Sequence, residues 1–226
     1  MIDYLFISPL GWSEHVWDKI ITDERFNSKS FEIVEFLNDS FENISKKHIN
    51  EYLIEKLNSL SKKGVVISSS YGTIALISSL TNSNILLNRL IIIEGFDMIP
   101  SLEELNNSFT YVEDKFYQNV SNYYDDMLSD DEKDDLELLD ILNHNLIVKK
   151  DIYTPKLDTK NTKSYLSIYS NFYIENGFIS VSNRINNFFI FSSSTISIPH
   201  TKISEENHLL MLKEPKELLD VIFNSD

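Results

Sequence analysis

The chain has 226 residues, of which 42% are hydrophobic and 12% aromatic, which suits one larger domain or a core with a modest insertion. Its net charge of −15 argues against nucleic acid as a partner, because affinity for nucleic acid comes from neutralised phosphates, and it disfavours anionic membrane surfaces. The chain has no cysteine, begins without a secretory signal and contains no apolar stretch long enough to span a bilayer. We therefore expect a cytoplasmic protein, and the abundance of Asn, Ile, Ser and Lys suggests a bacterial origin.

Apolar runs typical of buried strands alternate with helical patterns along the chain. This order predicts an α/β protein, with a mostly parallel central sheet flanked by helices. The predicted strands are residues 4–8, 31–36, 64–68, 89–94, 187–192 and 196–203. Apolar residues recur at helical spacing in 49–60 and 74–80, and both helices are expected to cover a face of the sheet.

The run from Ile67 to Gly72 reads Ile-Ser-Ser-Ser-Tyr-Gly, between an apolar stretch and a helical pattern. A strand, a sharp turn and a helix can hold a nucleophilic serine exposed at the apex of the turn, which is the position of Ser70. The turn requires small residues two positions before and two after the nucleophile. Ser68 and Gly72 meet this requirement, although Ser68 stands where glycine is usual. The run therefore predicts Ser70 as a nucleophile.

Residues 207–215 read Asn-His-Leu-Leu-Met-Leu-Lys-Glu-Pro and precede an amphipathic segment, 216–223. Together with Ser70, this stretch resembles the α/β-hydrolase fold family, in which the catalytic histidine follows the last strand and a Glu-Pro pair leads into the final helix. The resemblance implies that His208 is the general base. The remaining histidines are weaker candidates: His15 as a residue lining the pocket, His48 and His144 in polar helical stretches, and His200 without a following Glu-Pro.

Residues 9–17, after the first predicted strand, are similar to the oxyanion loop of this family and the tryptophan-bearing helix behind it. Ser8-Pro9 replaces the family's usual His-Gly pair. The resemblance implies that the backbone N–H groups of Leu10 and Tyr71 are the oxyanion donors, with Gly11 and Trp12 beside the substrate. Independently, four of the five glycines, at positions 11, 64, 72 and 95, fall at turns where such a site needs positive φ or close approach.

Residues 97–180 interrupt the alternation and are expected to form a helical lid or cap, inserted into a core formed by 1–96 and 181–226. Two helical stripes lie within this segment, at 116–127 and 136–142, and the second is preceded by a capping pattern at 129–132. The acidic cluster at 125–135 lacks the spacing and the glycine of a calcium loop, so a solvated helix face is favoured. Four aromatic residues either line an apolar acyl pocket or pack the lid onto the core: Tyr165, Tyr169, Phe172 and Tyr173.

The acid of the triad does not occupy its usual place. The family usually supplies an aspartate after the strand predicted at 187–192, where this chain reads Ser-Ser-Ser-Thr. In some haloalkane dehalogenases and lipases the acid follows the preceding core strand instead. That position holds Glu94, the first candidate, and Asp97, the second. A carboxylate there would orient the imidazole and stabilise the imidazolium, whereas a salt bridge from Glu94 to the lid is the structural alternative.

These residues predict a serine hydrolase that cleaves a carboxylic ester or thioester through an acyl-enzyme on Ser70. The sequence has no metal-ligand cluster, phosphate loop or dinucleotide glycine pattern, so no cofactor is implied. The expected partner is a small-molecule acyl substrate, with a carrier protein or a homodimer as further possibilities. Two alternatives stay open. The departures from the family pattern favour a catalytically impaired pseudo-hydrolase that acts as a binding or accessory protein, and the fold also serves acyltransferases, lyases and isomerases.

Overall fold

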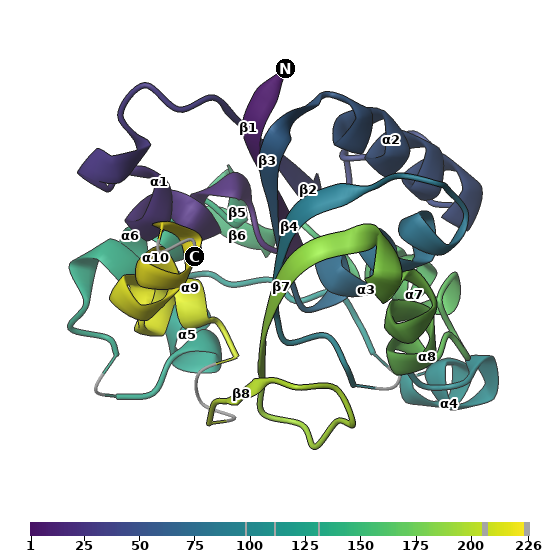
Figure 1. Ribbon diagram of the computed structural model, residues 1–226. Helices are drawn as coiled ribbons and strands as arrows, with labels where there is room; N and C mark the ends of the chain where they lie inside the picture. Colours follow the sequence, from purple (N-terminus) through teal and green to yellow (C-terminus); the bar gives the residue numbers. More distant parts are fainter. Residues whose placement is uncertain (98, 111, 131, 205–207, 224–226) are drawn as a thin grey trace.

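The computed structural model describes residues 1–97, 99–110, 112–130, 132–204 and 208–223. Six strands form one parallel sheet in the order β2-β1-β3-β4-β7-β8 (Figure 1). The strands are β1 (Ile2–Leu10), β2 (Phe31–Phe36), β3 (Leu60–Ser69), β4 (Leu87–Ile93), β7 (Ile185–Ser192) and β8 (Thr201–Lys202). Because all six run in one direction, their carboxyl ends lie along one edge of the sheet.

Helices cover both faces of the sheet, and alternate residues of each strand point to opposite faces. Leu5 and Ile7 of β1 pack with α2 (Lys46–Asn58), α3 (Tyr71–Thr81) and α8 (Ile174–Val181). Tyr4 and Phe6 pack on the other face with η1 (Glu14–Trp17), α1 (Asp18–Ile21), η2 (Glu24–Phe26), α9 (Leu210–Lys213) and α10 (Pro215–Phe223). Burial on both faces explains why the strands read as continuous apolar runs.

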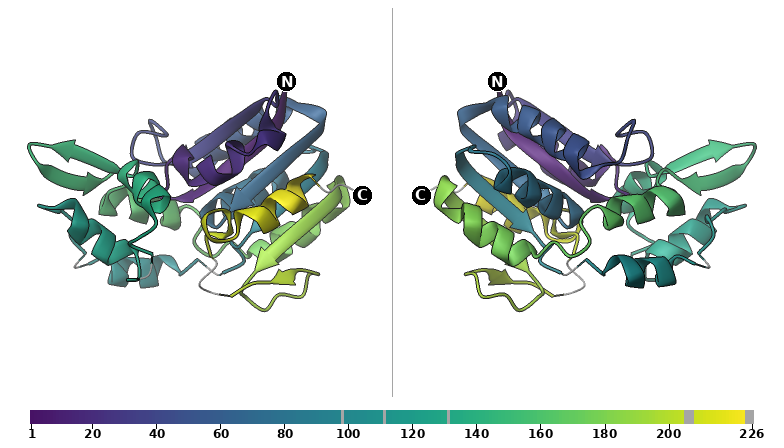
Figure 2. Two further views of the ribbon diagram at one scale, coloured as in Figure 1. Left: turned by 90° about the vertical axis from the view of Figure 1, so that its left-hand side faces the viewer. Right: turned by 90° about the vertical axis from the view of Figure 1, so that its right-hand side faces the viewer.

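We call the residues between β4 and β7 the inserted segment, because they lie between two strands of the main sheet. This segment contains helices and an antiparallel hairpin. Its helices are α4 (Leu102–Ser108), α5 (Val120–Met127), α6 (Leu136–Asn143) and α7 (Thr159–Ser167), followed by α8 and η3 (Ser182–Arg184). The hairpin, β5 (Leu146–Lys149) and β6 (Ile152–Pro155), extends away from the main sheet (Figure 2). Tyr165 of α7 and Phe178 of α8 belong to the same buried cluster as the sheet. The assignment of 97–180 to a separate lid stays a prediction.

Five of the six predicted strands are confirmed; β1, β3 and β7 are longer than predicted, and β4 ends at Ile93, one residue early. Gly64, predicted at a turn, lies inside β3. The prediction of a strand at 196–203 is wrong apart from β8, because Pro199 has no N–H to donate and Ser197 donates its N–H to Glu175 of α8 at 2.7 Å. The predicted helices at 49–60 and 74–80 correspond to α2 and α3, but α2 ends at Asn58, and Leu60 begins β3 instead of continuing the helix. The hairpin was not predicted by periodicity.

Both helical stripes predicted between β4 and β7 are confirmed as helices: α5 begins four residues later than predicted, and α6 begins at Leu136 as predicted but with a different cap. Phe116 lies before α5, which begins after the cap residue Asn119. Glu132 accepts hydrogen bonds from Ser129, but this pair closes a turn, and Asp135 is the residue that caps α6. Asp131, part of the predicted capping pattern and acidic cluster, lies outside the described residues. No helix within the described ranges is long and apolar enough to cross a membrane.

Candidate active site

Ser70 occupies a strained turn between β3 and α3. Its backbone has φ 50° and ψ −120°, a conformation that costs a non-glycine residue about 1–3 kcal/mol and persists only where the surroundings impose it. The surroundings here are two backbone hydrogen bonds: Ser70 N–H donates to Ile93 O at 2.9 Å, and Thr73 N–H donates to Ser70 O at 3.0 Å. The turn leaves the Ser70 side chain without a capping role in α3. The predicted strand–turn–helix is therefore present, with Ser70 at its apex.

The residues around the turn have the small size that it requires. A Cβ atom on Gly72 would lie 2.6 Å from Ser8 O and 2.7 Å from Ile7 O, so α3 approaches the backbone of β1 too closely for a side chain. A Cβ atom on Gly95, which has φ 101°, would lie 2.5 Å from Ser70 O. Ser68 is fully buried, and its hydroxyl accepts a hydrogen bond from Thr73 Oγ1 at 3.0 Å. Serine is therefore accommodated where glycine is usual.

His208 lies opposite the turn, directly before α9. Its Nε2 is 3.2 Å from Ser70 Oγ, although the two residues are 138 positions apart in the sequence. The imidazole is half-buried. Pro215 is the first residue of α10, a position at which proline is favoured. The helix that the resemblance implies after the Glu-Pro pair is therefore present. Asn207, the first residue of that motif, lies outside the described residues. The structure thus brings the predicted nucleophile and base within hydrogen-bonding distance.

Glu94 and Asp97, the two candidate acids, have different surroundings. Glu94 is fully buried at the end of β4, with φ 59°, and its Oε1 accepts the N–H of Ser193 at 2.6 Å. Its Oε2 lies 3.4 Å from Ser192 Oγ. The Glu94 carboxylate therefore reaches the end of β7, after which the family usually places its aspartate. Asp97 is exposed, and its Oδ1 accepts a hydrogen bond from Ser194 Oγ at 2.5 Å.

Among the residues that the structure describes, neither carboxylate forms a hydrogen bond or ion pair with His208. The alternative role predicted for Glu94 was a salt bridge to the lid. Within the described residues, Glu94 forms no salt bridge to the segment between β4 and β7. Glu94 is held by the end of β7 instead. The interaction of an acid with His208 stays a prediction.

The loop after β1 carries the predicted oxyanion residues. Leu10 is the last residue of β1, and Gly11 has φ 80° and donates its N–H to Phe36 O at 3.2 Å. In the sheet register Ile7 pairs with Ser68, so this loop begins beside the strand end that leads to Ser70. Tyr71 is the first residue of α3, where backbone N–H groups have no partner within the helix. Both predicted donors are therefore at the carboxyl edge of the sheet.

Two side chains support this loop. Ser8, in place of the usual histidine, accepts a hydrogen bond from Trp17 Nε1 at 3.0 Å. Asn145, buried between α6 and β5, accepts the N–H of Ser13 at 2.8 Å and so joins the loop to the inserted segment. Asn145 was missed by sequence reasoning, because one asparagine in a polar stretch carries no signal of a contact 132 positions away.

Comparisons with known proteins bear on the fold. No protein-family model matches the chain, and no curated protein matches its sequence. The structure is similar to E-2-(acetamidomethylene)succinate hydrolase, with a TM-score of 0.68 and 10% identity over 98% of this chain and 90% of that one. It is also similar to the thioesterase domain from the curacin biosynthetic pathway (TM-score 0.66, 10% identity, 98% and 90% covered). A third match is the peroxisomal α/β-hydrolase Lpx1 of Saccharomyces cerevisiae (TM-score 0.61, 15% identity, 97% and 74% covered).

The chain has the α/β-hydrolase fold. This finding confirms the resemblance and the predicted fold class. At identities of 10–15% the similarity extends to the arrangement of the backbone and not to a substrate.

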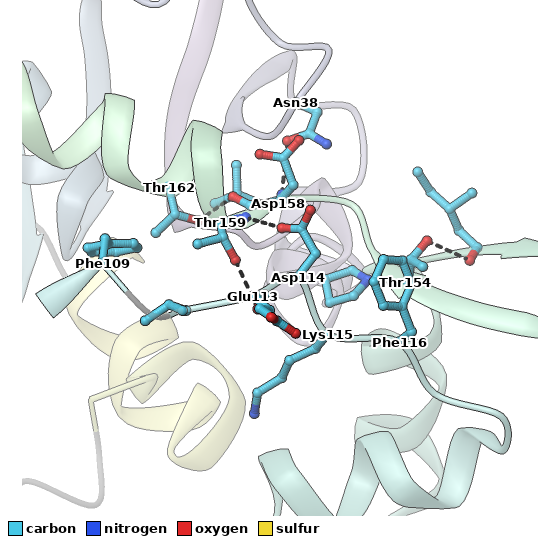
Figure 3. Close-up of a pocket in the computed structure, with 14 residues that line it drawn as sticks. Asn38, Phe109, Glu113, Asp114, Lys115, Phe116, Thr154, Asp158, Thr159 and Thr162 are labelled. Carbon is cyan, nitrogen blue, oxygen red and sulfur yellow. Dashed lines mark hydrogen bonds between the residues drawn. The ribbon is translucent and has the colours of Figure 1, made fainter.

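Two adjoining cavities lie near the predicted oxyanion residues, and one of the two is lined by residues of the loop after β1. We call the first the inner cavity; its volume is about 270 Å³, and Leu10, Gly11 and Trp12 form part of its wall. The second, the outer cavity, has a volume of about 410 Å³ and lies between the inserted segment and Asn38 (Figure 3). Ser70 lines neither cavity. The inner cavity is the one of the two that contacts the loop with the predicted oxyanion residues.

The four aromatic residues in α7 and in the connection from α7 to α8 were expected either to line an acyl pocket or to pack the lid onto the core. Tyr165 and Tyr169 are fully buried in the main core, and the Tyr71 hydroxyl donates to Tyr165 O at 2.9 Å. Burial raises the pKa of both phenols. They pack in the core and line neither the inner nor the outer cavity. Phe172 and Tyr173 line a separate cavity of about 160 Å³.

The other histidines have local partners away from Ser70. The rings of His15 and His144 stack with 3.6 Å between centroids, and His15 Nδ1 lies 2.8 Å from Asp18 Oδ2. His200 Nδ1 lies 2.9 Å from Ile198 O, and His48 is exposed on α2. In the acidic cluster, several of the described carboxylates form ion pairs with lysines, including Asp126 with Lys115 and both Asp125 and Asp130 with Lys133.

Proposed function

We propose that the chain is a serine hydrolase that cleaves a carboxylic ester or thioester through an acyl-enzyme on Ser70. The observation that carries the proposal is the 3.2 Å separation of His208 Nε2 and Ser70 Oγ at a strained strand–helix turn. A serine hydroxyl is a weak nucleophile until a base removes its proton, and a histidine at this distance can do so. The known hydrolases, thioesterase and esterases that share the fold support this class of reaction.

In the proposed acylation step, the Ser70 Oγ–H proton moves to His208 Nε2 as Oγ forms a bond to the substrate carbonyl carbon. The carbonyl oxygen becomes an oxyanion, and the N–H groups of Leu10 and Tyr71 donate hydrogen bonds to it. One such donor is worth about 2.7–4 kcal/mol of transition-state stabilisation. The bond to the leaving group then breaks, and His208 gives its proton to the departing alcohol or thiol.

In the proposed deacylation step, water replaces the alcohol or thiol. His208 takes a proton from the water as its oxygen attacks the acyl carbon, and the carboxylic acid leaves as Ser70 Oγ recovers the proton. Glu94, at the end of β4, is the proposed acid. Its carboxylate is buried and accepts the N–H of Ser193, just after the neighbouring strand β7, where the family usually places its aspartate. The segment 97–180 is the proposed cap over this edge of the sheet.

A second candidate function is that of a catalytically impaired member of the fold that binds a ligand or partner. The observation that favours it is the absence, within the described residues, of any carboxylate hydrogen-bonded to His208. An imidazole without such a partner is a weaker base. The two candidates differ in whether Ser70 is nucleophilic, which can be measured directly.

Labelling of the purified protein by a fluorophosphonate probe tests the proposal. We expect the wild-type protein to be labelled, Ser70→Ala to be unlabelled and His208→Ala to be labelled at least about 100-fold more slowly, because general-base assistance contributes about 10²–10⁴-fold. Ser69→Ala is the matched control, since Ser69 is the neighbouring serine in the same run. Absence of labelling in a folded wild-type protein, or equal labelling of Ser70→Ala, would refute the proposal and favour a binding role.

A further inference from the structure

The inner and outer cavities meet at four residues that line both: Lys115, Pro155, Leu157 and Thr162. Three of these four side chains have little freedom to move, two because of a polar interaction and one because it is a proline. Lys115 Nζ pairs with Asp126 at 2.8 Å, Thr162 Oγ1 donates to Asp158 O at 2.8 Å, and a proline ring is rigid. Leu157 is the remaining side chain, and it is the large aliphatic one. The connection between the cavities therefore depends on Leu157.

Leu157 also packs on the oxyanion loop. A Cβ atom built on Gly11 would lie 3.4 Å from Leu157 Cδ2, an ordinary van der Waals contact. The backbone on each side of Leu157 is fixed, because Lys156 N–H donates to Asn145 O at 2.8 Å and Asp158 N–H donates to Asn38 Oδ1 at 3.0 Å. A side chain on such a segment stays at the junction. Leu157 thus separates the space beside the loop from the space beyond it.

The walls of both cavities are mainly apolar. In the inner cavity Trp12, Met127 and two tyrosines face the space. Burial, with a smaller contribution from Asp126 at Tyr117, raises the pKa of Tyr117 and Tyr123 to about 12, so both phenols are neutral at pH 7. The outer cavity adds phenylalanine, valine and isoleucine side chains. Such walls suit a hydrocarbon chain rather than a sugar or a nucleotide.

Three carboxylates in the wall of the outer cavity restrict what a chain that reaches this cavity can carry. Glu113, Asp114 and Asp158 line the outer cavity (Figure 3). Asp114 accepts the N–H of Thr159 at 2.9 Å and Asp158 that of Asn161 at 2.6 Å. A second carboxylate at the end of a substrate chain would be repelled here, so an uncharged chain end is the better fit.

We infer that the substrate's acyl group is an uncharged hydrocarbon chain lying in the inner cavity, and that Leu157 sets the longest chain accepted. The inference rests on the proposed function for the acyl bond itself. At roughly 30 Å³ for a group of the size of water, the inner cavity holds at most about nine chain atoms. Longer chains must displace Leu157 to reach the outer cavity. Truncating Leu157 should join the two cavities and admit them.

The first test measures hydrolysis of p-nitrophenyl esters from acetate to palmitate by the wild-type protein and Leu157→Ala. We expect wild-type kcat/KM to peak at or below a chain of about nine carbons and then fall. In Leu157→Ala, kcat/KM for the dodecanoyl ester should rise about tenfold or more, because each buried methylene is worth about fourfold. Leu157→Phe should move the optimum to shorter chains. Leu136→Ala, a 79% exposed leucine that lines neither cavity, is the matched control.

A second test keeps the inference independent of catalysis. Binding of saturated fatty acids from C6 to C16 is measured by calorimetry in the Ser70→Ala background, with and without Leu157→Ala. We expect Leu157→Ala to tighten binding of dodecanoate about tenfold and to leave hexanoate nearly unchanged. An unchanged chain-length profile in both tests would overturn the role of Leu157. A shifted binding profile together with an unreactive Ser70 would overturn the proposed hydrolase and leave the assignment of the chain site standing.

Discussion

Exchange of Glu94 for glutamine tests which carboxylate assists His208. The substitution keeps the shape of a fully buried side chain and removes only its charge. Glutamine can still accept the Ser193 N–H through its carbonyl oxygen, and its amide can donate to Ser192 Oγ. We therefore expect the fold to survive, with a urea midpoint close to that of the wild-type protein. Asp97→Asn, an exposed carboxylate on the same strand–loop connection, is the matched control.

The expected size of the effect follows from burial. Glu94 and His208 form no ion pair within the described residues, and the prediction assumes that the imidazolium formed during acylation moves to about 4 Å from the carboxylate. At that distance the two groups attract each other by about 4 kcal/mol at an effective dielectric constant of about 20, but by only about 1 kcal/mol in bulk water. Each 1.4 kcal/mol is about tenfold in rate. The buried Glu94 should therefore contribute about 10²- to 10³-fold to the acylation rate, and the exposed Asp97 at most about fivefold.

The assay is the second-order rate of fluorophosphonate labelling of Ser70, measured from pH 5 to pH 9, with kcat for a short p-nitrophenyl ester as a second readout. Glu94→Gln should be slow at every pH, while Asp97→Asn should follow the wild-type profile. A Glu94→Gln rate within about threefold of the wild-type rate would refute the reasoning, because the predicted loss is at least about 10²-fold. A large loss confined to Asp97→Asn would instead assign the acid to Asp97.

Two further predictions concern stability, both measured by urea unfolding. Gly72→Ala should lose about 1–3 kcal/mol through overpacking, because its Cβ would lie 2.6 Å from a backbone oxygen of β1. Gly177→Ala, where the new Cβ meets side-chain atoms, should lose less, and equal stability of the two variants would contradict the close approach. Hydrogen bonds from the first turn of α6, chiefly from the Leu138 N–H, hold the pKa of Asp135 below its ordinary value of 3.8. The ionised Asp135 therefore stabilises the folded protein above pH 3.8, and this contribution is lost as the pH falls through the folded-state pKa. Asp135→Ala should therefore cost about 1 kcal/mol at pH 7 and less near pH 3, relative to the exposed Asp134→Ala; a constant difference would contradict this.

The sequence by itself determined the parts of the fold that depend on local pattern. Continuous apolar runs identified five strands because both faces of a parallel sheet are buried. The turn at Ser70 was predictable because its backbone geometry demands small neighbours, and Gly72 meets a contact of 2.6 Å with β1. The spacing of apolar residues likewise located α2, α3, α5 and α6, but it did not locate α4, α7 or α8.

Only the tertiary structure decided which distant residues meet. The approach of His208 to Ser70 depends on the order of the strands and the packing of α9, and a separation of 138 positions leaves no local signal. The same applies to Asn145 on the oxyanion loop, to Leu157 on Gly11 and to the reach of the Glu94 carboxylate to the end of β7. The failed strand at 196–203 has the same cause, since its apolar pattern is overridden by a contact with α8. Local pattern fixes the elements, whereas the contacts between their ends form only when the sheet assembles.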